Sequence, residues 1–379
     1  MRILISAGEA SGDLYASRLV EAMRARHPET EFFGCAGPRM QAAGVRAIVD
    51  ARSLSVVGIV EVLGHLPRIW KEFRRLAFAA RAERPDLAIL TDSPDFHLRL
   101  AKRLHRLNVP VVYLVAPQAW AWRTGRVRIM RRNIKRLLCI FPFERDFFEK
   151  HGVPTTYIGH PLAAMVKPSM CRGEFNSKFG FVPEDRILAL LPGSRPGEVA
   201  RHLPILIESA ASIRAKQAVK AVVALPPGFV VPSTLRERIR AASIQIIVGC
   251  TWDVLAQSEL ALAASGTITI EAALLGIPMV TFYRVNALSW ILGRRLVRAP
   301  FLTMVNLVAG RQVVPELIQR DMTSDRIAAE ACGLLADRSR RETMRADLAE
   351  VSKRLRTGRD PMEVASEWIE RLWSEKHRN

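Results

Sequence analysis

The sequence has little of what marks several large classes of protein. Its five cysteines are odd in number and scattered, without a CxxC pair, which argues against a disulfide framework and a zinc site and favours a reducing compartment. No DxD motif and no cluster of His and Cys is present, so we expect neither a metal nor a cofactor. Its uncharged stretches, such as Val109–Trp122, are interrupted by proline and fall short of the ~20 residues of a membrane span.

The N-terminus does not resemble a signal peptide either. In MRILISAGEASGD the apolar run is short and an acid and glycines follow it, so we expect a cytoplasmic protein. Acidic charge is scarce, because 56 Lys and Arg stand against 37 Asp and Glu and leave a net charge of +19. Such a charge attracts nucleic acid, anionic lipid or phosphorylated substrates, and it does not choose among them.

What the sequence does contain is an α/β pattern. At 379 residues with 49% hydrophobic residues, two globular domains are expected. Short apolar strands alternate with amphipathic helices, beginning with Ile3–Ser6 and Leu87–Thr91 in the first half and with Ile187–Leu191 and Leu260–Ala264 in the second. This alternation predicts two Rossmann-like domains, each a parallel sheet with helices on both faces, and a cleft between them.

The domain boundaries follow from changes in composition. Ala163–Pro183 has little periodicity and is predicted to be a linker. We therefore place the first domain at 1–165 and the second at 166–355, with a C-terminal helix in 356–379 that either packs back on the first domain or is exchanged in a dimer. Within the first domain an apolar segment of helical period, Leu54–Leu66, precedes a separate helix at Ile69–Arg84.

Two turns in the first half follow predicted strands. Gly8 to Asp13, with the sequence GEASGD, connects strand one to helix one, where open α/β sheets bind ligands. Glycines allow close approach of a ligand and Ser11 suits an N-cap, so a plain capped turn explains the segment equally well. Asp92 ends a buried-looking strand, and there a carboxylate can take a proton from an acceptor hydroxyl. For Asp95 we predict a helix cap instead.

The second half repeats this placement with residues suited to phosphate. Pro192-Gly193-Ser194-Arg195 follows a strand, and arginine at the start of a helix suits an anion. Ser265-Gly266-Thr267 forms a second turn of small residues, whose amides can cradle a diphosphate. Glu271, one helical turn further on among apolar neighbours, suits ribose hydroxyls. Together these residues predict a site for a sugar nucleotide.

Three further stretches combine aromatic residues with arginine. Val56–Arg75 and Leu288–Val305 mix Trp, Phe and aliphatic residues with several arginines, which suits an anionic membrane surface. A core-packed helix with a solvated basic face is the alternative for each. In the loop Ala116–Arg123, Trp120 and Trp122 fit either a sugar or acyl pocket or the core.

Several strings of residues together carry a resemblance to a known family. They are AGEASGD (Ala7–Asp13), AGPRMQAAG (Ala36–Gly44), VGIVEVLG (Val57–Gly64), DSPDF (Asp92–Phe96), WAWR (Trp120–Arg123), IGHP (Ile158–Pro161), LLPGSR (Leu190–Arg195), ASGT followed by Glu271, and NLVAGR (Asn306–Arg311). In this order, over nearly the whole chain, they resemble the lipid-A-disaccharide synthases, which are inverting glycosyltransferases of the GT-B type. One departure is His97, where the family often has Asn.

The resemblance implies a reaction and a set of site residues. The 6-hydroxyl of 2,3-diacylglucosamine 1-phosphate (lipid X) attacks the anomeric carbon of UDP-2,3-diacylglucosamine, which gives a β-1′,6-linked disaccharide 1-phosphate and UDP in lipid A biosynthesis. The essential acids of the family match Asp92 and Glu9. Its nucleotide-side residues match Arg195, Ser265, Gly266, Thr267, Glu271 and Asn306. Family members are peripheral proteins of the cytoplasmic face of the inner membrane, and often homodimers that exchange a C-terminal segment.

Two kinds of alternative remain at this point. One is another sugar-nucleotide enzyme of the same architecture, either a peptidoglycan-type N-acetylglucosaminyltransferase or a UDP-sugar 2-epimerase. The other is a basic nucleic-acid-binding protein, which needs clustered Lys and Arg with aromatics on one face. We expect no nucleic-acid partner.

Overall fold

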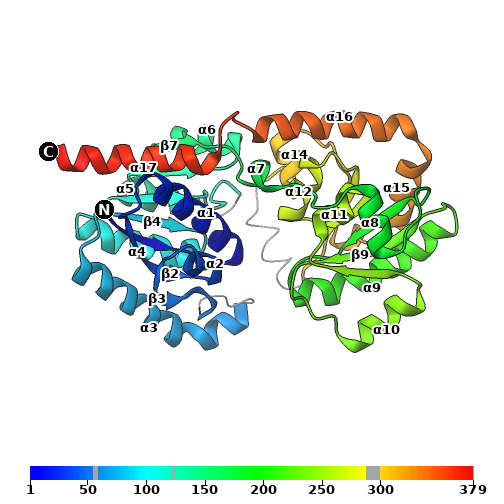
Figure 1. Cartoon of the computed structure of the whole chain (residues 1–379), viewed down its shortest axis with the longest axis horizontal. Coiled ribbons are helices and arrows are strands. Elements are labelled where there is room, and N and C mark those ends of the chain that lie inside the picture. The colour runs from blue at the N-terminus through cyan, green and yellow to red at the C-terminus, as the bar shows by residue number, and fades with distance from the viewer. Residues whose placement is uncertain (54–58, 122–123, 287–298, 379) are drawn as a thin grey trace. The chain divides into compact units, whose positions relative to one another are not determined.

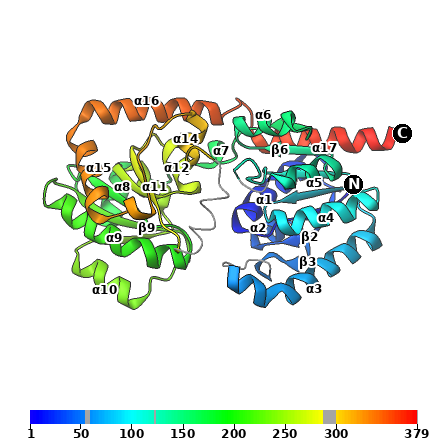
Figure 2. The same ribbon diagram turned by 180° about the vertical axis from the view of Figure 1, so that it is seen from behind.

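The computed structural model describes residues 1–53, 59–121, 124–286 and 299–378, which fall into two compact units. Unit 1 comprises Met1–Ala164 together with Leu355–Asn379, and unit 2 comprises Met165–Arg354. Each unit contains one parallel sheet with helices packed on it, as Figure 1 and the reverse view in Figure 2 show.

Unit 1 is built on a seven-stranded sheet of order β3-β2-β1-β4-β5-β6-β7. Its strands are β1 (Arg2–Ser6), β2 (Glu31–Ala36), β3 (Arg46–Asp50), β4 (Leu87–Thr91), β5 (Val111–Leu114), β6 (Arg136–Cys139) and β7 (Thr155–Tyr157). Its helices are α1 (Ala10–Arg26), α2 (Pro38–Ala42), α3 (Ile59–Glu83), α4 (Pro94–Arg106), α5 (Gly125–Asn133), α6 (Pro142–Lys150), α7 (Leu162–Met165, at the boundary) and α17 (Pro361–Arg378). The central strand β4 is buried along its whole length, as is typical of parallel sheets covered on both faces.

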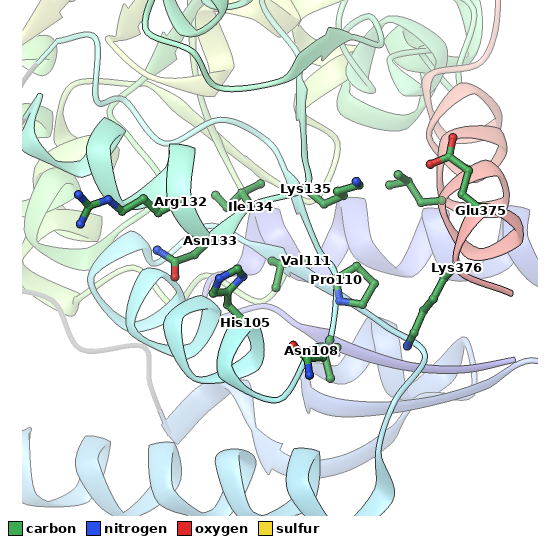
Figure 3. Close-up of a pocket in the computed structure, with 12 residues that line it drawn as sticks. His105, Asn108, Pro110, Val111, Arg132, Asn133, Ile134, Lys135, Glu375 and Lys376 are labelled. Atoms are coloured by element: carbon green, nitrogen blue, oxygen red, sulfur yellow. The ribbon is translucent and has the colours of Figure 1, made fainter. Parts of the chain in front are cut away.

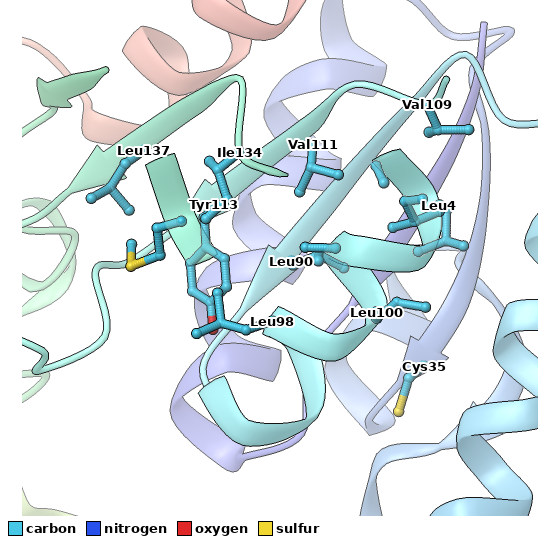
Figure 4. Close-up of a cluster of buried hydrophobic side chains, with 14 of the residues drawn as sticks. Leu4, Cys35, Leu90, Leu98, Leu100, Val109, Val111, Tyr113, Ile134 and Leu137 are labelled. Atoms are coloured by element: carbon cyan, nitrogen blue, oxygen red, sulfur yellow. The ribbon is translucent and has the colours of Figure 1, made fainter. Parts of the chain in front are cut away.

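The helices of unit 1 form two sets. α1 packs against α2 and α17, while α4 packs against both α3 and α5. Figure 4 shows the core under the second set, where Leu4, Leu90 and Tyr113 point from β1, β4 and β5 toward Leu98 and Leu100 of α4. The C-terminal helix is also joined to α1 by a two-bond ion pair between Arg26 and Glu370. Chain termini far apart in sequence therefore complete one core.

Unit 2 repeats this plan with six strands in the order β10-β9-β8-β11-β12-β13. Its strands are β8 (Ile187–Leu191), β9 (Lys220–Leu225), β10 (Gln245–Val248), β11 (Ser258–Ala264), β12 (Met279–Tyr283) and β13 (Glu316–Ile318). Its helices are α8 (Arg172–Phe179), α9 (Pro196–Arg214), α10 (Ser233–Ala241), α11 (Thr251–Ala256), α12 (Thr267–Leu274), α14 (Met304–Ala309), α15 (Ser324–Ala336) and α16 (Arg338–Leu355). The predicted parallel α/β architecture of both halves is confirmed.

Two predictions about the local structure are wrong. The supposed linker contains α7 and α8, and Asp253 accepts hydrogen bonds from the amides of Ser169 and Met170, which fixes the segment to unit 2. A helix as short as α8 leaves only a weak periodic pattern in the sequence. In the structure Phe175 of this helix packs against both Phe179 and Phe181. The second error lies in α3, which continues through Pro67 instead of breaking there.

The strand orders place a switch point at the same position in each sheet. β1 lies between β2 and β4, and β8 lies between β9 and β11, so the chain leaves adjacent strands toward opposite sides. Ligands of open α/β sheets bind at the carboxyl ends of such strand pairs. The turns after β1 and β4, and those after β8 and β11, are therefore the first places to look for a site.

Candidate functional site

The switch point of unit 1 brings the glycine-rich turn and Asp92 together. Ser6 of β1 is paired with Leu90 of β4, so the residues that follow the two strands emerge side by side. The Asp92 carboxylate accepts a 2.8 Å hydrogen bond from the Gly8 amide and a 3.0 Å bond from the Glu9 amide. Asp92 is thus held at the N-terminus of α1, where the helix favours negative charge.

Two glycines make this close approach possible. A Cβ atom at Gly12 would overlap Oδ2 of Asp92 and lie 2.8 Å from its Cγ. A Cβ atom at Gly8 would lie 3.2 Å from Oδ1 of Asp92 and would overlap the Ser93 side chain. The glycines of the first turn therefore leave room for a carboxylate that comes from a different strand.

The surroundings of Asp92 suit a proton acceptor. The pKa of Asp92 is raised to about 7, chiefly by burial and also by the nearby Glu9 carboxylate, against the lowering effect of the Gly8 and Glu9 amides. The Asp92 side chain is nevertheless 12% exposed, so an outside hydroxyl can reach it. A carboxyl group with a pKa near the working pH is well matched to general base catalysis.

Three further residues of these turns are Ser11, Asp13 and Asp95, and the two acids among them have structural roles. The predicted cap at Ser11 is wrong, because α1 begins at Ala10 and Ser11 lies exposed in its first turn. Asp13 is buried and accepts hydrogen bonds from Arg39 and Met40, at the start of α2. Asp95 is also no cap, since Ser93 holds the N-cap position and Asp95 forms a 2.8 Å ion pair with Arg126.

The switch point of unit 2 forms a pocket of about 320 Å³. Its lining includes five residues predicted from the sequence: Arg195, Ser265, Gly266, Thr267 and Glu271. They come from the turns after β8 and β11 and from α12, whose first residue is Thr267. The pocket therefore combines a guanidinium, a turn of small residues and a carboxylate within one concave site.

The arginine turn of this pocket is held in shape by Glu198. The Glu198 carboxylate accepts bonds from the amides of Ser194 (3.2 Å) and Arg195 (3.3 Å) and from the Arg195 guanidinium (3.4 Å). The Tyr283 hydroxyl also donates to Glu198, over 3.3 Å. Gly193 has φ of 120° and a Cβ atom there would lie 2.6 Å from Oε2 of Glu198, so only glycine fits.

Glu271 is fixed by a tryptophan. The Trp252 indole donates a 2.6 Å hydrogen bond to Oε2 of Glu271. Burial raises the pKa of Glu271, while the bond from Trp252 lowers it. The carboxylate is thus oriented at the wall of the pocket before any ligand binds.

Asn306 is the one predicted nucleotide-side residue that the structure does not bring to this pocket. Asn306 is fully buried in α14, and its amide group donates to the Val314 carbonyl and to Glu316. Its Oδ1 atom accepts the amides of Val313 and Val314. These bonds hold the approach to β13, which is a structural task that a motif match does not reveal.

Of the tryptophan loop, Trp120 is described and Trp122 lies outside the described residues. Trp120 is half-buried, packs edge-on against Phe143 with ring centroids 5.0 Å apart, and donates a 3.2 Å bond to Glu144. Burial raises the pKa of Glu144 to about 8. In this structure Trp120 packs with the protein's own residues, which matches the core alternative.

A basic and aromatic groove lies between α3 and α4, with a volume of about 1160 Å³. Trp70 and Phe78 are 54% and 74% exposed there, and Trp70 stacks on Phe73. The cations that line it are Arg74, Arg75, Arg81, Arg99, Lys102, Arg103 and Arg106. Residues 56–65 of the predicted lipid segment Val56–Arg75, and residues 288–298 of Leu288–Val305, fall outside the residues whose side chains are described.

A different groove, of about 450 Å³, lies at the amino ends of the strands of the unit 1 sheet. Its residues include Pro110, Val111 and Lys135, at the amino ends of β5 and β6, together with Glu375 and Lys376 of α17 (Figure 3). Asp92 follows the carboxyl end of β4, so this groove is remote from it. Within the described part of the chain, no group of His, Cys, Asp and Glu is arranged for a metal, and no helix is long and apolar enough to cross a membrane.

Comparison with known proteins places these features in a family. The family model described as "Lipid-A-disaccharide synthetase" matches residues 3–365. A protein of Solibacter usitatus named lipid-A-disaccharide synthase is 58% identical over 360 residues, which cover 94% of each chain. The protein of Koribacter versatilis with the same name is 44% identical over 368 residues, which cover 95% of this chain and 94% of its own.

Solved structures with low sequence identity share the fold. A structure of S. aureus MnaA with UDP has a TM-score of 0.65 at 12% identity, and covers 97% of this chain and 94% of its own. The glycotransferase of kitacinnamycin has a TM-score of 0.63 at 16% identity and covers 98% of both chains. The two Rossmann-like units thus have the GT-B fold expected from the sequence.

Proposed function

The chain belongs to the lipid-A-disaccharide synthase family of glycosyltransferases in lipid A biosynthesis, and from this premise we propose its substrates and the task of each site. UDP-2,3-diacylglucosamine is the donor, 2,3-diacylglucosamine 1-phosphate is the acceptor, and the products are the β-1′,6-linked disaccharide 1-phosphate and UDP. The observation that supports this most is the Asp92 carboxylate, largely but not fully buried, held at the end of β4 with a pKa near neutrality.

In the proposed step the acceptor's 6-hydroxyl oxygen forms a bond to the anomeric carbon of the donor. The bond from that carbon to the UDP oxygen breaks, so the configuration inverts. Asp92 takes the hydroxyl proton, and Gly8 and Glu9 orient its carboxylate through their amides. The Glu9 carboxylate acts on the reaction by keeping the pKa of Asp92 high.

The pocket of unit 2 is proposed to hold the UDP part of the donor. Arg195 and the amides of the turn from Ser265 to Thr267 face the diphosphate, whose charge increases as UDP departs. Glu271, oriented by Trp252, accepts hydrogen bonds from the ribose hydroxyls. Asn306 contributes indirectly, through the packing of α14 against α12.

Both proposed substrates carry acyl chains, which suggests that the enzyme works at a membrane surface. We assign this contact to the groove between α3 and α4, where exposed Trp70 and Phe78 can enter the lipid interface while arginines meet anionic headgroups. The association is peripheral, at the cytoplasmic face of the inner membrane. The homodimer implied by the resemblance stays a prediction, for which sedimentation of the purified protein is the measurement.

The direct test supplies the purified protein with both acylated substrates and measures disaccharide 1-phosphate and UDP. We expect product only when both are present, and none when UDP-N-acetylglucosamine replaces the donor. Epimerisation of an unacylated UDP-sugar, or transfer to an unacylated acceptor, would overturn the assignment. A thermal shift with UDP and none with an oligonucleotide separates this function from nucleic-acid binding.

A further inference from the structure

Asp92 has an unusual backbone conformation. Its φ is 53° and that of Ser93 is 34°, so two successive residues lie in the left-handed region between β4 and α4. Residues other than glycine rarely adopt this region, and they keep it only where neighbouring groups hold them there. The same conformation turns the Asp92 carboxylate toward Gly8 and Glu9.

The group that is held is the Asp92 carbonyl. It accepts a 2.5 Å bond from the Tyr113 hydroxyl of β5 and lies 3.0 Å from Nδ1 of His97 in α4. Tyr113 and His97 are both completely buried. Two side chains from different elements therefore hold the backbone of Asp92, and Nδ1 of His97 also lies 3.8 Å from Oδ1 of the Asp92 carboxylate.

The hydrogen-bond partners decide the tautomer of His97. A carbonyl can only accept, so Nδ1 carries the hydrogen and donates to Asp92. Nε2 must then accept, and its partner is the Ser6 hydroxyl of β1, 2.7 Å away. Burial lowers the pKa of His97 to about 4, which agrees with a neutral ring at the pH of catalysis. Ser6, His97 and Asp92 thus form a chain of bonds that links β1, α4 and the end of β4.

We propose that His97 is a positioning residue for the transfer reaction, which keeps Asp92 in its left-handed conformation by the Nδ1–H bond to the Asp92 carbonyl and thereby aims the carboxylate at the acceptor hydroxyl. This proposal rests on the base role proposed for Asp92. His97 is completely buried and acts through Asp92, and Tyr113 supports the same carbonyl from β5.

Three substitutions separate this role from that of a histidine that only fills the core. His97→Asn keeps a donor at the position of Nδ1 and loses the acceptor for Ser6. His97→Gln places its polar group further out, so it keeps the Ser6 contact and loses the one to Asp92. His97→Leu loses both.

We expect kcat to fall about 100-fold in the Gln and Leu variants, as for other small misplacements of a catalytic group, while KM for the donor stays unchanged. His97→Asn should stay within about threefold of the wild-type kcat, because the bond to Asp92 persists. An Asn variant as slow as the Leu variant, or Gln and Leu variants with wild-type kcat, would overturn the proposal. The effects are compared in full-length variants with equal melting temperatures.

A spectroscopic measurement makes the two proposals separable. In protein labelled with ¹⁵N-His and ¹³C-Asp, the His97 ring should show a protonated Nδ1, and the Asp92 carbonyl shift should move in the Gln and Leu variants and stay in the Asn variant. If the wild type forms no disaccharide, the proposed function fails, while this measurement still tests the hydrogen bond from His97 to the Asp92 carbonyl. A neutral His97 ring protonated at Nε2 would contradict this hydrogen bond, whatever the activity of the protein.

Discussion

Gly12 of α1 and Asp92 after β4 are 80 positions apart in sequence, yet a side chain at the first would occupy the space of the carboxylate at the second. The contact exists because β1 and β4 are neighbours in the sheet. It explains why a helix that could gain stability from alanine carries glycine in its first turn.

The first prediction concerns this glycine. Gly12→Ala should displace the Asp92 carboxylate from the Gly8 and Glu9 amides and lower kcat by about 100-fold or more. UDP binding by unit 2, measured by calorimetry, should be unchanged. Gly125→Ala is the matched control, since a Cβ atom at Gly125 meets nothing within 4 Å. Wild-type turnover in Gly12→Ala would show that the position of Asp92 does not matter.

A second prediction is the pH dependence of the reaction. A base must be deprotonated, and the pKa of Asp92 is raised to about 7, so kcat/KM should fall as the pH drops below about 7. Glu9→Gln removes a negative charge that raises this pKa, and it should move the acidic limb of the profile to lower pH. Asp92→Asn should abolish the limb together with most of the activity. A profile of Glu9→Gln displaced to higher pH would contradict this electrostatic role.

The third prediction addresses the pocket of unit 2. Arg195→Ala should weaken UDP binding by about tenfold, because a charge-assisted contact to phosphate is lost. Arg195→Lys should recover only part of it, since lysine cannot form the two-pronged contact. Isothermal titration with UDP measures both. Arg240→Ala, at an exposed position of α10, is the control for loss of positive charge, and an equal effect there would remove the specific role of Arg195.

The fourth prediction tests the groove between α3 and α4. Replacing Trp70 and Phe78 by Ser, or Arg99 and Arg103 by Glu, should reduce sedimentation with vesicles that contain phosphatidylglycerol. Pure phosphatidylcholine vesicles should bind weakly in every case. Val230→Ser removes an exposed apolar side chain of unit 2 and is the matched control. If the control reduces binding as much as the groove variants, the contact surface lies elsewhere.

The fifth prediction is a loss of stability in acid. Burial lowers the pKa of His97 to about 4 and that of His160 to about 3, so both stay neutral in the fold while the unfolded chain binds protons below about pH 6.5. The free energy of unfolding should therefore fall as pH drops from 6.5 toward 4, by about 3 kcal/mol for His97 alone.

His160→Asn keeps an acceptor for the Leu162 amide and should flatten this dependence. Urea unfolding at pH 8 and pH 5 provides the comparison, because at pH 8 both histidines are neutral in either state. The difference in unfolding free energy between the two pH values should be smaller in the variant than in the wild type. An unchanged difference would show that His160 does not bind protons on unfolding.

Much of the candidate site was open to prediction because it lies in turns directly after apolar strands. Asp92, Arg195 and the turn from Ser265 to Thr267 carry their chemistry in residue type and local placement. The sequence did not reveal three residues that support the site, namely His97, Tyr113 and Glu198. Each acts through a hydrogen bond that no local sequence pattern indicates. Asn306 lies within a matching string, and only the structure shows that its amide group bonds the backbone that leads to β13; its assignment to the nucleotide stays a prediction.

The sequence by itself determined the two α/β halves, the family, the carboxylate that follows β4 in unit 1 and the arginine that follows β8 in unit 2. Local periodicity and turn composition encode these, and they need no knowledge of distant contacts. The tertiary structure alone decided that Gly12 makes room for Asp92 and that His97 and Tyr113 hold its backbone. Such pairings depend on which strands become neighbours in the sheet, and that order arises only when the whole unit buries its core.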